Sequence, residues 1–214
     1  MMINRLARTL LMMLCLAAPA AFGDDHAEDE GWVNLIPEAG EEGIAGWSVG
    51  NERGADHWAL TDGVIVGENE DRAGSILWTE GEYTDFELIV EYRTPSQDYD
   101  SGIFLRGPSH QVQIGISRSL RRDMTACIYA PRDGQGGYPG QNDNVEDLHN
   151  IGEWNTMRMV VTGNRIRTFL NGEAVVDYEA RTIPDQGRIG LQLHANVHMV
   201  MEFRVVRVRE IEAE

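Results

Sequence analysis

The chain has 214 residues and a formal net charge of −17, from 18 basic and 35 acidic side chains. All the basic residues are arginine, which excludes Schiff-base chemistry and a P-loop lysine. The acidic excess argues against nucleic acid as a partner, because phosphates must be neutralised by clustered cations. The hydrophobic fraction of 42% and the charged fraction of 25% are ordinary for a globular domain.

Met1–Gly23 has the pattern of an export signal. Two arginines precede an apolar run over residues 10–18, and small residues stand at Ala21 and Gly23, where a signal peptidase cleaves. The run is short for a bilayer span, so an uncleaved anchor is the weaker alternative. An acidic spacer, 24–31, follows, and no second apolar segment is long enough for a membrane helix. We therefore expect a periplasmic or secreted protein.

After removal of this leader one cysteine remains, Cys127, so no disulfide can form within the chain. Stability must then come from an apolar core, which a single domain over residues 32–210 is long enough to build. We expect Cys127 to be a small buried hydrophobe rather than a reactive thiol.

Alternation of apolar and polar residues with period two recurs along the chain and predicts strands. It is clearest over residues 85–93, 154–162 and 165–170, and a long last strand is expected over about 197–209. Asn171-Gly172 predicts a type I′ hairpin turn, because both residues tolerate positive φ. About eleven short strands joined by glycine-rich turns predict an all-β fold, an antiparallel β-sandwich or jelly roll.

Some segments give weaker signals. The irregular segment 118–151 is expected to be a functional or mobile loop. Asp56 and His57 are adjacent, but no serine motif or third partner accompanies them, so a hydrolytic triad is not expected. The tryptophans expected to lie in the core are Trp47, Trp58, Trp78 and Trp154.

Three predicted strands, 101–106, 111–116 and 187–194, each combine an aliphatic face with a polar one. The polar faces carry Gly102, Phe104, Arg106, Gln111, Gln113, Gly115, Gly190, Gln192 and His194. Glutamine amides donate and accept hydrogen bonds, so they can match sugar hydroxyls. An aromatic ring can cover a pyranose, and glycines leave space. If the strands are neighbours, this face suits a carbohydrate; a solvated face without a role is the alternative.

Short motifs follow one another along almost the whole chain, from about residue 32 to 209. They are Gly46-Trp47, Trp58-x-x-x-Asp62-Gly-Val64, Tyr83–Leu88, Asp100–Arg106, Gln111–Ile114, Gly152–Asn155, Leu170–Gly172 and Gly187-x-Ile-Gly-Leu-Gln-x-His194. In this order they resemble the 3-keto-disaccharide hydrolase domain family. The resemblance implies a concanavalin-like jelly roll that acts on glycosides already oxidised at carbon three of the sugar.

The implied reaction assigns roles to particular residues. A ketone at carbon three acidifies the hydrogen on carbon two, so a base can start elimination of the group on carbon one, and water can then add. His194 is the expected base, since imidazoles as a class titrate near neutral pH. Arg106 is expected to stabilise the developing enolate or to orient a sugar hydroxyl, and Gln113 is a third catalytic residue that would orient the sugar. The expected substrate-binding residues are Asp100, Phe104, Gln111, Tyr129 and Gln192.

A cofactor and a partner follow from the same resemblance. His194, His110 and His198 can donate to a divalent metal, although no spacing in the sequence is diagnostic of a ligand set. The ligand is expected to be a saccharide or 3-keto-glycoside, and an oxidoreductase partner would supply the keto sugar.

The chain departs from the family pattern at positions where carboxylates are expected. Gln111 stands in place of a glutamate, Gly115 and Ile116 occupy the region of an aspartate, and Leu193 replaces the aspartate before His194. A non-catalytic carbohydrate-binding module is therefore the alternative function. A protein-interaction domain is a third, favoured only by the acidic spacer. A two-carboxylate glucanase is disfavoured, because no strand carries a paired carboxylate arrangement.

Overall fold

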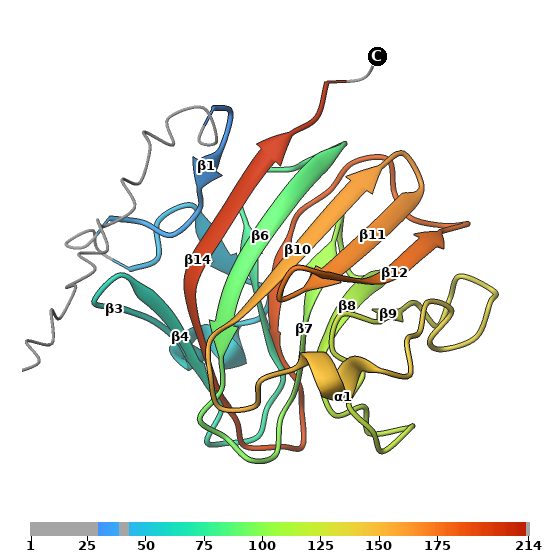
Figure 1. Ribbon diagram of the computed structural model, residues 1–214. Helices are drawn as coiled ribbons and strands as arrows, with labels where there is room; N and C mark the ends of the chain where they lie inside the picture. Colours follow the sequence, from blue (N-terminus) through green and yellow to red (C-terminus); the bar gives the residue numbers. More distant parts are fainter. Residues whose placement is uncertain (1–29, 39–42, 213–214) are drawn as a thin grey trace, which may run out of the picture. The chain divides into compact units, whose positions relative to one another are not determined.

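The computed structural model describes residues 30–38 and 43–212, so the predicted export signal lies outside the described residues. The chain divides into two units, 1–30 and 31–214, and the fold is that of the second unit (Figure 1). Its strands form two antiparallel sheets, which confirms the predicted β-sandwich. None of the helices in the described ranges is long and apolar enough to cross a membrane.

The larger sheet has the strand order β12-β11-β10-β6-β14-β4-β3, with β1 also paired to β14. Its members are β1 (Val33–Asn34), β3 (Trp58–Thr61), β4 (Val64–Glu68), β6 (Phe86–Arg93), β10 (Asn155–Thr162), β11 (Arg165–Leu170), β12 (Glu173–Glu179) and β14 (Val200–Glu210). Figure 1 shows β14, β6, β10 and β11 side by side.

The smaller sheet has the order β2-β5-β13-β7-β8-β9. Its members are β2 (Trp47–Val49), β5 (Ser75–Thr79), β7 (Asp100–Leu105), β8 (His110–Gly115), β9 (Ile128–Tyr129) and β13 (Gly190–Leu193). A 3₁₀ helix, η1 (Glu52–His57), and a single α-helical turn, α1 (Val145–Leu148), lie in the connections.

The hairpin predicted at Asn171-Gly172 is confirmed. The two residues have φ values of 50° and 92°, as a type I′ turn requires, and they join β11 to β12. The predicted strand over 85–93 is β6, and its apolar set is fully buried. These side chains are Phe86, Leu88, Val90 and Tyr92.

The core lies between the facing aliphatic sides of the two sheets. Leu88 and Val90 of the larger sheet and Ile103, Val112 and Leu191 of the smaller one all have 0% exposure. Burying one such side chain stabilises the fold by about 1.5–3 kcal/mol. Since these residues fill one side of the smaller sheet, the polar residues that alternate with them must lie on its other side.

Two predictions about buried residues have different outcomes. Cys127 is fully buried, and burial raises the pKa of its thiol to about 11, so the prediction of an unreactive core cysteine is confirmed. The prediction for the tryptophans is half wrong. Trp47 and Trp58 are core residues, whereas Trp78 lies over the polar side of the smaller sheet and Trp154 lies outside the core.

Trp154 belongs to a layer of arginines and carboxylates on the outer side of the larger sheet. The guanidinium groups of Arg93 and Arg204 both lie over its ring, at 4.7 and 4.4 Å from the ring centroid. Arg93 in turn pairs with Glu202, and Arg204 with Glu91. Planar guanidinium groups can stack and pair at the same time, which a lysine cannot do equally well.

Candidate functional site

The three predicted strands that combine an aliphatic and a polar face lie side by side, in the order β13-β7-β8. In one row of the register, Gln192 is opposite Gly102, which is opposite Gln113. In the next row, Phe104 pairs with Gln111, and Gln111 pairs with Tyr129 of β9. The alternation therefore places these side chains on one side of the sheet, away from the core.

Three glutamines form one hydrogen-bonded group on this side. The Gln111 amide nitrogen donates to Gln192 Oε1 at 3.0 Å, to Gln113 Oε1 at 3.3 Å and to the Ser101 carbonyl at 3.1 Å. Gln113 Nε2 donates to Asp100 Oδ1 at 2.7 Å. Gln111 is 3% exposed and Gln113 is 1% exposed, so the amides are fixed by their partners.

Glycines make this arrangement sterically possible, but not in the way expected from the sequence. A Cβ at Gly102 would lie 2.0 Å from Gln111 Nε2, and one at Gly190 would lie 2.6 Å from the Trp78 ring. The space left by these glycines is occupied by Gln111 and Trp78, whereas the sequence suggested that it would accommodate a sugar. Trp78 also covers Phe104, with ring centroids 5.6 Å apart.

Tyr138 is a functional residue that the sequence did not reveal. Its hydroxyl donates to Gln113 Oε1 at 3.2 Å, and burial raises its pKa to about 12, so the donor stays protonated. Both ends of the Gln113 amide are therefore engaged, by Tyr138 and Gln111 at the oxygen and by Asp100 at the nitrogen. Gln113 therefore positions its neighbours. The sequence predicted a catalytic role for Gln113, but both polar atoms of its amide are already bound to protein groups.

A hollow of about 570 Å³ opens over this side of the sheet. We call it the amide hollow, and define it by Gln111, Gln113, Gln192, His194 and Tyr129, which line it. The other predicted residues that line it are Asp100 and Phe104, and the residues that the sequence did not single out include Arg118, Arg132 and Tyr138. Arg106 alone of the predicted site residues does not line it.

His194 lines this hollow, and one of its ring nitrogens has no hydrogen-bond partner among the described residues. Its Nδ1 lies 2.7 Å from the carbonyl oxygen of Ala195. A carbonyl only accepts, so Nδ1 must carry the hydrogen, and the neutral ring then has its lone pair on Nε2. Nε2 makes no hydrogen bond within the part of the chain that the structure describes. The ring is therefore arranged as a base.

The predicted position of Arg106 on the polar face is wrong. β7 ends at Leu105, and Arg106 has a φ of 53°, which turns its side chain out of the strand alternation. The guanidinium is 2% exposed and donates to the carbonyls of Thr84 at 2.5 Å and Gly163 at 2.6 Å, and to Asp85 at 2.8 Å. Arg106 therefore joins the segment before β6 to the turn between β10 and β11, and its guanidinium is not available to a ligand.

The irregular segment 118–151 supplies one wall of the amide hollow, and two buried histidine–aspartate pairs hold it. His110 Nε2 lies 3.2 Å from Asp133, and His149 Nδ1 lies 2.6 Å from Asp123. Asp133 also accepts the backbone N–H groups of Arg181 and Thr182 and the Tyr178 hydroxyl. These contacts fix the loop that carries Tyr129, Arg132 and Tyr138.

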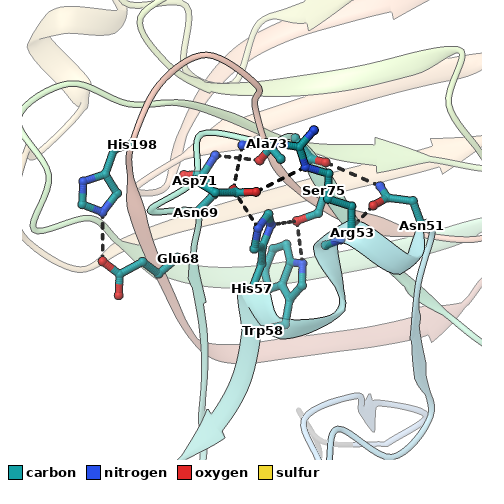
Figure 2. Close-up of polar contacts among 12 residues, drawn as sticks. Asn51, Arg53, His57, Trp58, Glu68, Asn69, Asp71, Ala73, Ser75 and His198 are labelled. Atoms are coloured by element: carbon teal, nitrogen blue, oxygen red, sulfur yellow. Dashed lines mark hydrogen bonds and ion pairs between the residues drawn. The ribbon is translucent and has the colours of Figure 1, made fainter.

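A second polar cluster surrounds His57, and here the structure supplies partners that the sequence did not indicate. Figure 2 shows His57 between Asp71, 3.0 Å from Nε2, and Ser75, whose Oγ is 3.0 Å from Nδ1. The order Asp-His-Ser is that of a hydrolytic triad. However, Ser75 is 2% exposed and its hydroxyl also accepts from Trp58 Nε1 at 3.0 Å. This cluster anchors η1 to β5 and presents no open nucleophile.

The three histidines expected to be able to bind a metal do not meet. His110 is paired with Asp133, His198 with Glu68, and His194 with Ala195. Among the described residues, no three His, Cys, Asp or Glu side chains are placed to hold a metal ion. The histidines of the described ranges are therefore not gathered into a metal centre.

Solved structures with the same fold show its class. A protein from Parabacteroides distasonis, described provisionally as a glycosyl hydrolase, is 22% identical with a TM-score of 0.60, over 84% of this chain and 99% of its own. The carbohydrate-binding module CBM66 from Bacillus subtilis is 13% identical with a TM-score of 0.51, over 77% and 96%. The mannose-bound luminal domain of VIP36 is 10% identical with a TM-score of 0.61, over 87% and 92%.

At these identities the likeness shows the fold alone, and that fold is the jelly roll of lectins and carbohydrate-binding modules. The family is shown by the sequence itself. Residues 31–209 match the model of the 3-keto-alpha-glucoside-1,2-lyase-like domain, and the chain belongs to this family. The resemblance drawn from the motifs is thereby confirmed. A search of curated protein sequences gave no match.

Proposed function

We propose that the amide hollow binds a 3-keto-glycoside and cleaves it by elimination, with His194 as the base. The observation that carries this proposal is that His194, whose Nε2 has no hydrogen-bond partner among the described residues, lines the amide hollow together with three glutamine amides. Family membership supports the same chemistry.

The proton transfers and bond changes balance without any cofactor. His194 Nε2 takes the proton from carbon two, and the C–H electrons move into an enolate whose charge rests on the oxygen at carbon three. The enolate then re-forms the ketone and expels the group on carbon one, which receives a proton from the imidazolium. Addition of water across the new double bond completes a net hydrolysis.

One hydrogen-bond donor next to His194 is available for the enolate oxygen. Gln192 uses its Oε1 to accept from Gln111, so its Nε2 is left for a ligand. Gln192 lies on β13, two residues before His194, and lines the amide hollow. Gln192 takes the role of oxyanion donor that was expected of Arg106, since the Arg106 guanidinium is bound to Thr84 and Gly163.

The proposal is tested by following release of the leaving group from 3-keto-glycosides and from their unoxidised parents, with and without chelator. We expect release from the keto sugars alone. His194→Gln should lower kcat by about 10²–10⁴-fold, the usual contribution of a general base, while the affinity for the sugar changes little. Equal turnover by wild type and His194→Gln would contradict the assignment.

A non-catalytic saccharide-binding module is the second candidate. One observation favours it: among the described residues Asp100 is the only carboxylate that lines the hollow, and it accepts a hydrogen bond from Gln113. Binding of sugars without turnover of any keto-glycoside would support this reading. Export through the leader at Met1–Gly23 and an oxidoreductase that supplies the keto sugar also remain part of the proposal.

A further inference from the structure

The amide hollow is longer than the reaction at His194 requires. His194 follows β13, and Arg132 follows β9, with β7 and β8 between these two strands. Three spacings between neighbouring strands separate β13 from β9, which is about 14 Å. A single sugar ring placed at His194 therefore leaves the β9 end of the hollow unfilled.

The β9 end carries a positive charge without a compensating group. Arg132 is exposed, lines the hollow, and makes no hydrogen bond or ion pair within the described ranges. Arg118, which also lines the hollow, is paired with Asp98 at 3.2 Å and lies 3.8 Å from Asp100. The Arg132 guanidinium is therefore open to an acceptor group on a ligand in the hollow.

The same end also offers an aromatic surface. The rings of Tyr129 and Tyr138 are 5.0 Å apart between centroids, and both line the hollow. Aromatic faces cover the apolar face of a sugar ring, and the Tyr129 hydroxyl is free to accept or donate. A sugar residue fits this combination better than a small anion does, because an anion would leave the rings uncovered.

We propose that the β9 end is a second subsite, which binds a sugar residue bearing a carboxylate through Arg132. A guanidinium matches a carboxylate with two parallel hydrogen bonds, a geometry that neutral hydroxyls do not provide. The subsite rests on the proposed function, since it takes the sugar attached to the 3-keto unit that lies at His194. The preferred substrate is then a 3-keto-glucoside of a uronic acid.

The test compares three ligands by titration calorimetry at low ionic strength, using the His194→Gln protein so that none is cleaved. They are methyl 3-keto-glucoside, a 3-keto-glucosyl-glucose, and the 3-keto-glucosyl-glucuronate of the same linkage. We expect the glucuronate to bind about tenfold more tightly than the glucose compound, a gain expected of one charge-assisted pair. Arg132→Gln should abolish this difference without changing the binding of the methyl glycoside.

Arg121→Gln is the matched control, because Arg121 is an exposed arginine of the same segment that does not line the hollow. The subsite is refuted if the two disaccharides bind equally, or if Arg121→Gln removes the preference as fully as Arg132→Gln. If the methyl glycoside itself fails to bind, in wild type as well, the proposed function is refuted and the subsite with it.

Discussion

Gly102 shows how a single residue organises the site. Its missing Cβ lets the Gln111 amide lie across β7, where it reaches Gln192 and Gln113. The amide group would be displaced by any larger residue, because the added carbon would overlap Gln111 Nε2. Gly102 is thus needed for the shape of the amide hollow rather than for backbone conformation.

Gly102→Ala is therefore expected to weaken saccharide binding by about tenfold, since one or two hydrogen bonds of about 1 kcal/mol each are lost. Titration calorimetry with methyl 3-keto-glucoside, on the wild-type and Gly102→Ala proteins, measures the change in affinity. Gly137→Ala is the control, because its Cβ would make only a 3.8 Å contact. Unchanged binding in Gly102→Ala would show that the Gln111 amide does not shape the ligand site.

Arg106 is the residue for which the structure most changes the expectation. Removing its guanidinium leaves the carbonyls of Thr84 and Gly163 without this donor, and, within the described residues, the Asp85 carboxylate keeps only the Gly163 backbone N–H. We expect Arg106→Ala to lower the free energy of unfolding by about 3 kcal/mol.

The turnover number of the folded Arg106→Ala protein should match that of wild type, since this side chain does not reach the amide hollow. Urea denaturation and activity per folded molecule measure the two effects separately. Arg121→Ala, at an exposed site, should change stability by less than about 0.5 kcal/mol. A stable but inactive Arg106→Ala protein would restore a catalytic role to Arg106.

At the scale of elements, the loop over 118–151 depends on buried ionisable groups. Burial lowers the pKa of His110 below 6.5, against the opposing effect of Asp133, so folding favours the neutral ring. Burial works to raise the pKa of Asp123 and Asp133, but hydrogen bonds outweigh it and hold both below 3.8. All three groups have lowered pKa values in the folded state.

A group whose pKa is lower in the folded than in the unfolded state adds to the free energy of unfolding at pH values above its unfolded pKa. This added stability is lost as the pH falls through the pKa of the folded state. We expect a first loss of stability below about pH 6.5 from His110 and a second below about pH 3.8 from the aspartates. Urea midpoints between pH 8 and pH 3 report both. The His110→Gln protein should be less stable than wild type at every pH, but its stability should not fall between about pH 6.5 and the range where the aspartates titrate. If the loss below about pH 6.5 persists in this variant, it does not come from His110.

The elements that could be predicted are those with a local signal. Asn171-Gly172 sets its hairpin by backbone preference, and alternation correctly sorted the core and polar sides of β7, β8 and β13. Arg106 was misplaced because alternation holds only inside a strand, and the left-handed residue after Leu105 ends it. Tyr138 and Arg132 could not be found, because the loop that carries them has no periodic pattern.

In the sandwich as a whole, the residues that form the core and those that line the amide hollow lie on opposite sides of the smaller sheet. One side of the smaller sheet is packed against the core, and the other carries the amide hollow, whose fixed glutamines leave His194 and the β9 end open to a ligand. The chain belongs to the 3-keto-alpha-glucoside-1,2-lyase-like family, and the proposed elimination rests on this membership together with the placement of Gln192 and His194.

The proposed elimination begins when His194 removes the proton from carbon two of a 3-keto-glycoside. The most direct test is to incubate a 3-keto-glycoside deuterated at carbon two with the wild-type protein and to follow the label by NMR together with release of the leaving group. We predict loss of the deuterium to solvent with each release, and neither event with His194→Gln. Release of the leaving group with the label retained at carbon two would contradict the elimination and the role of His194 in it.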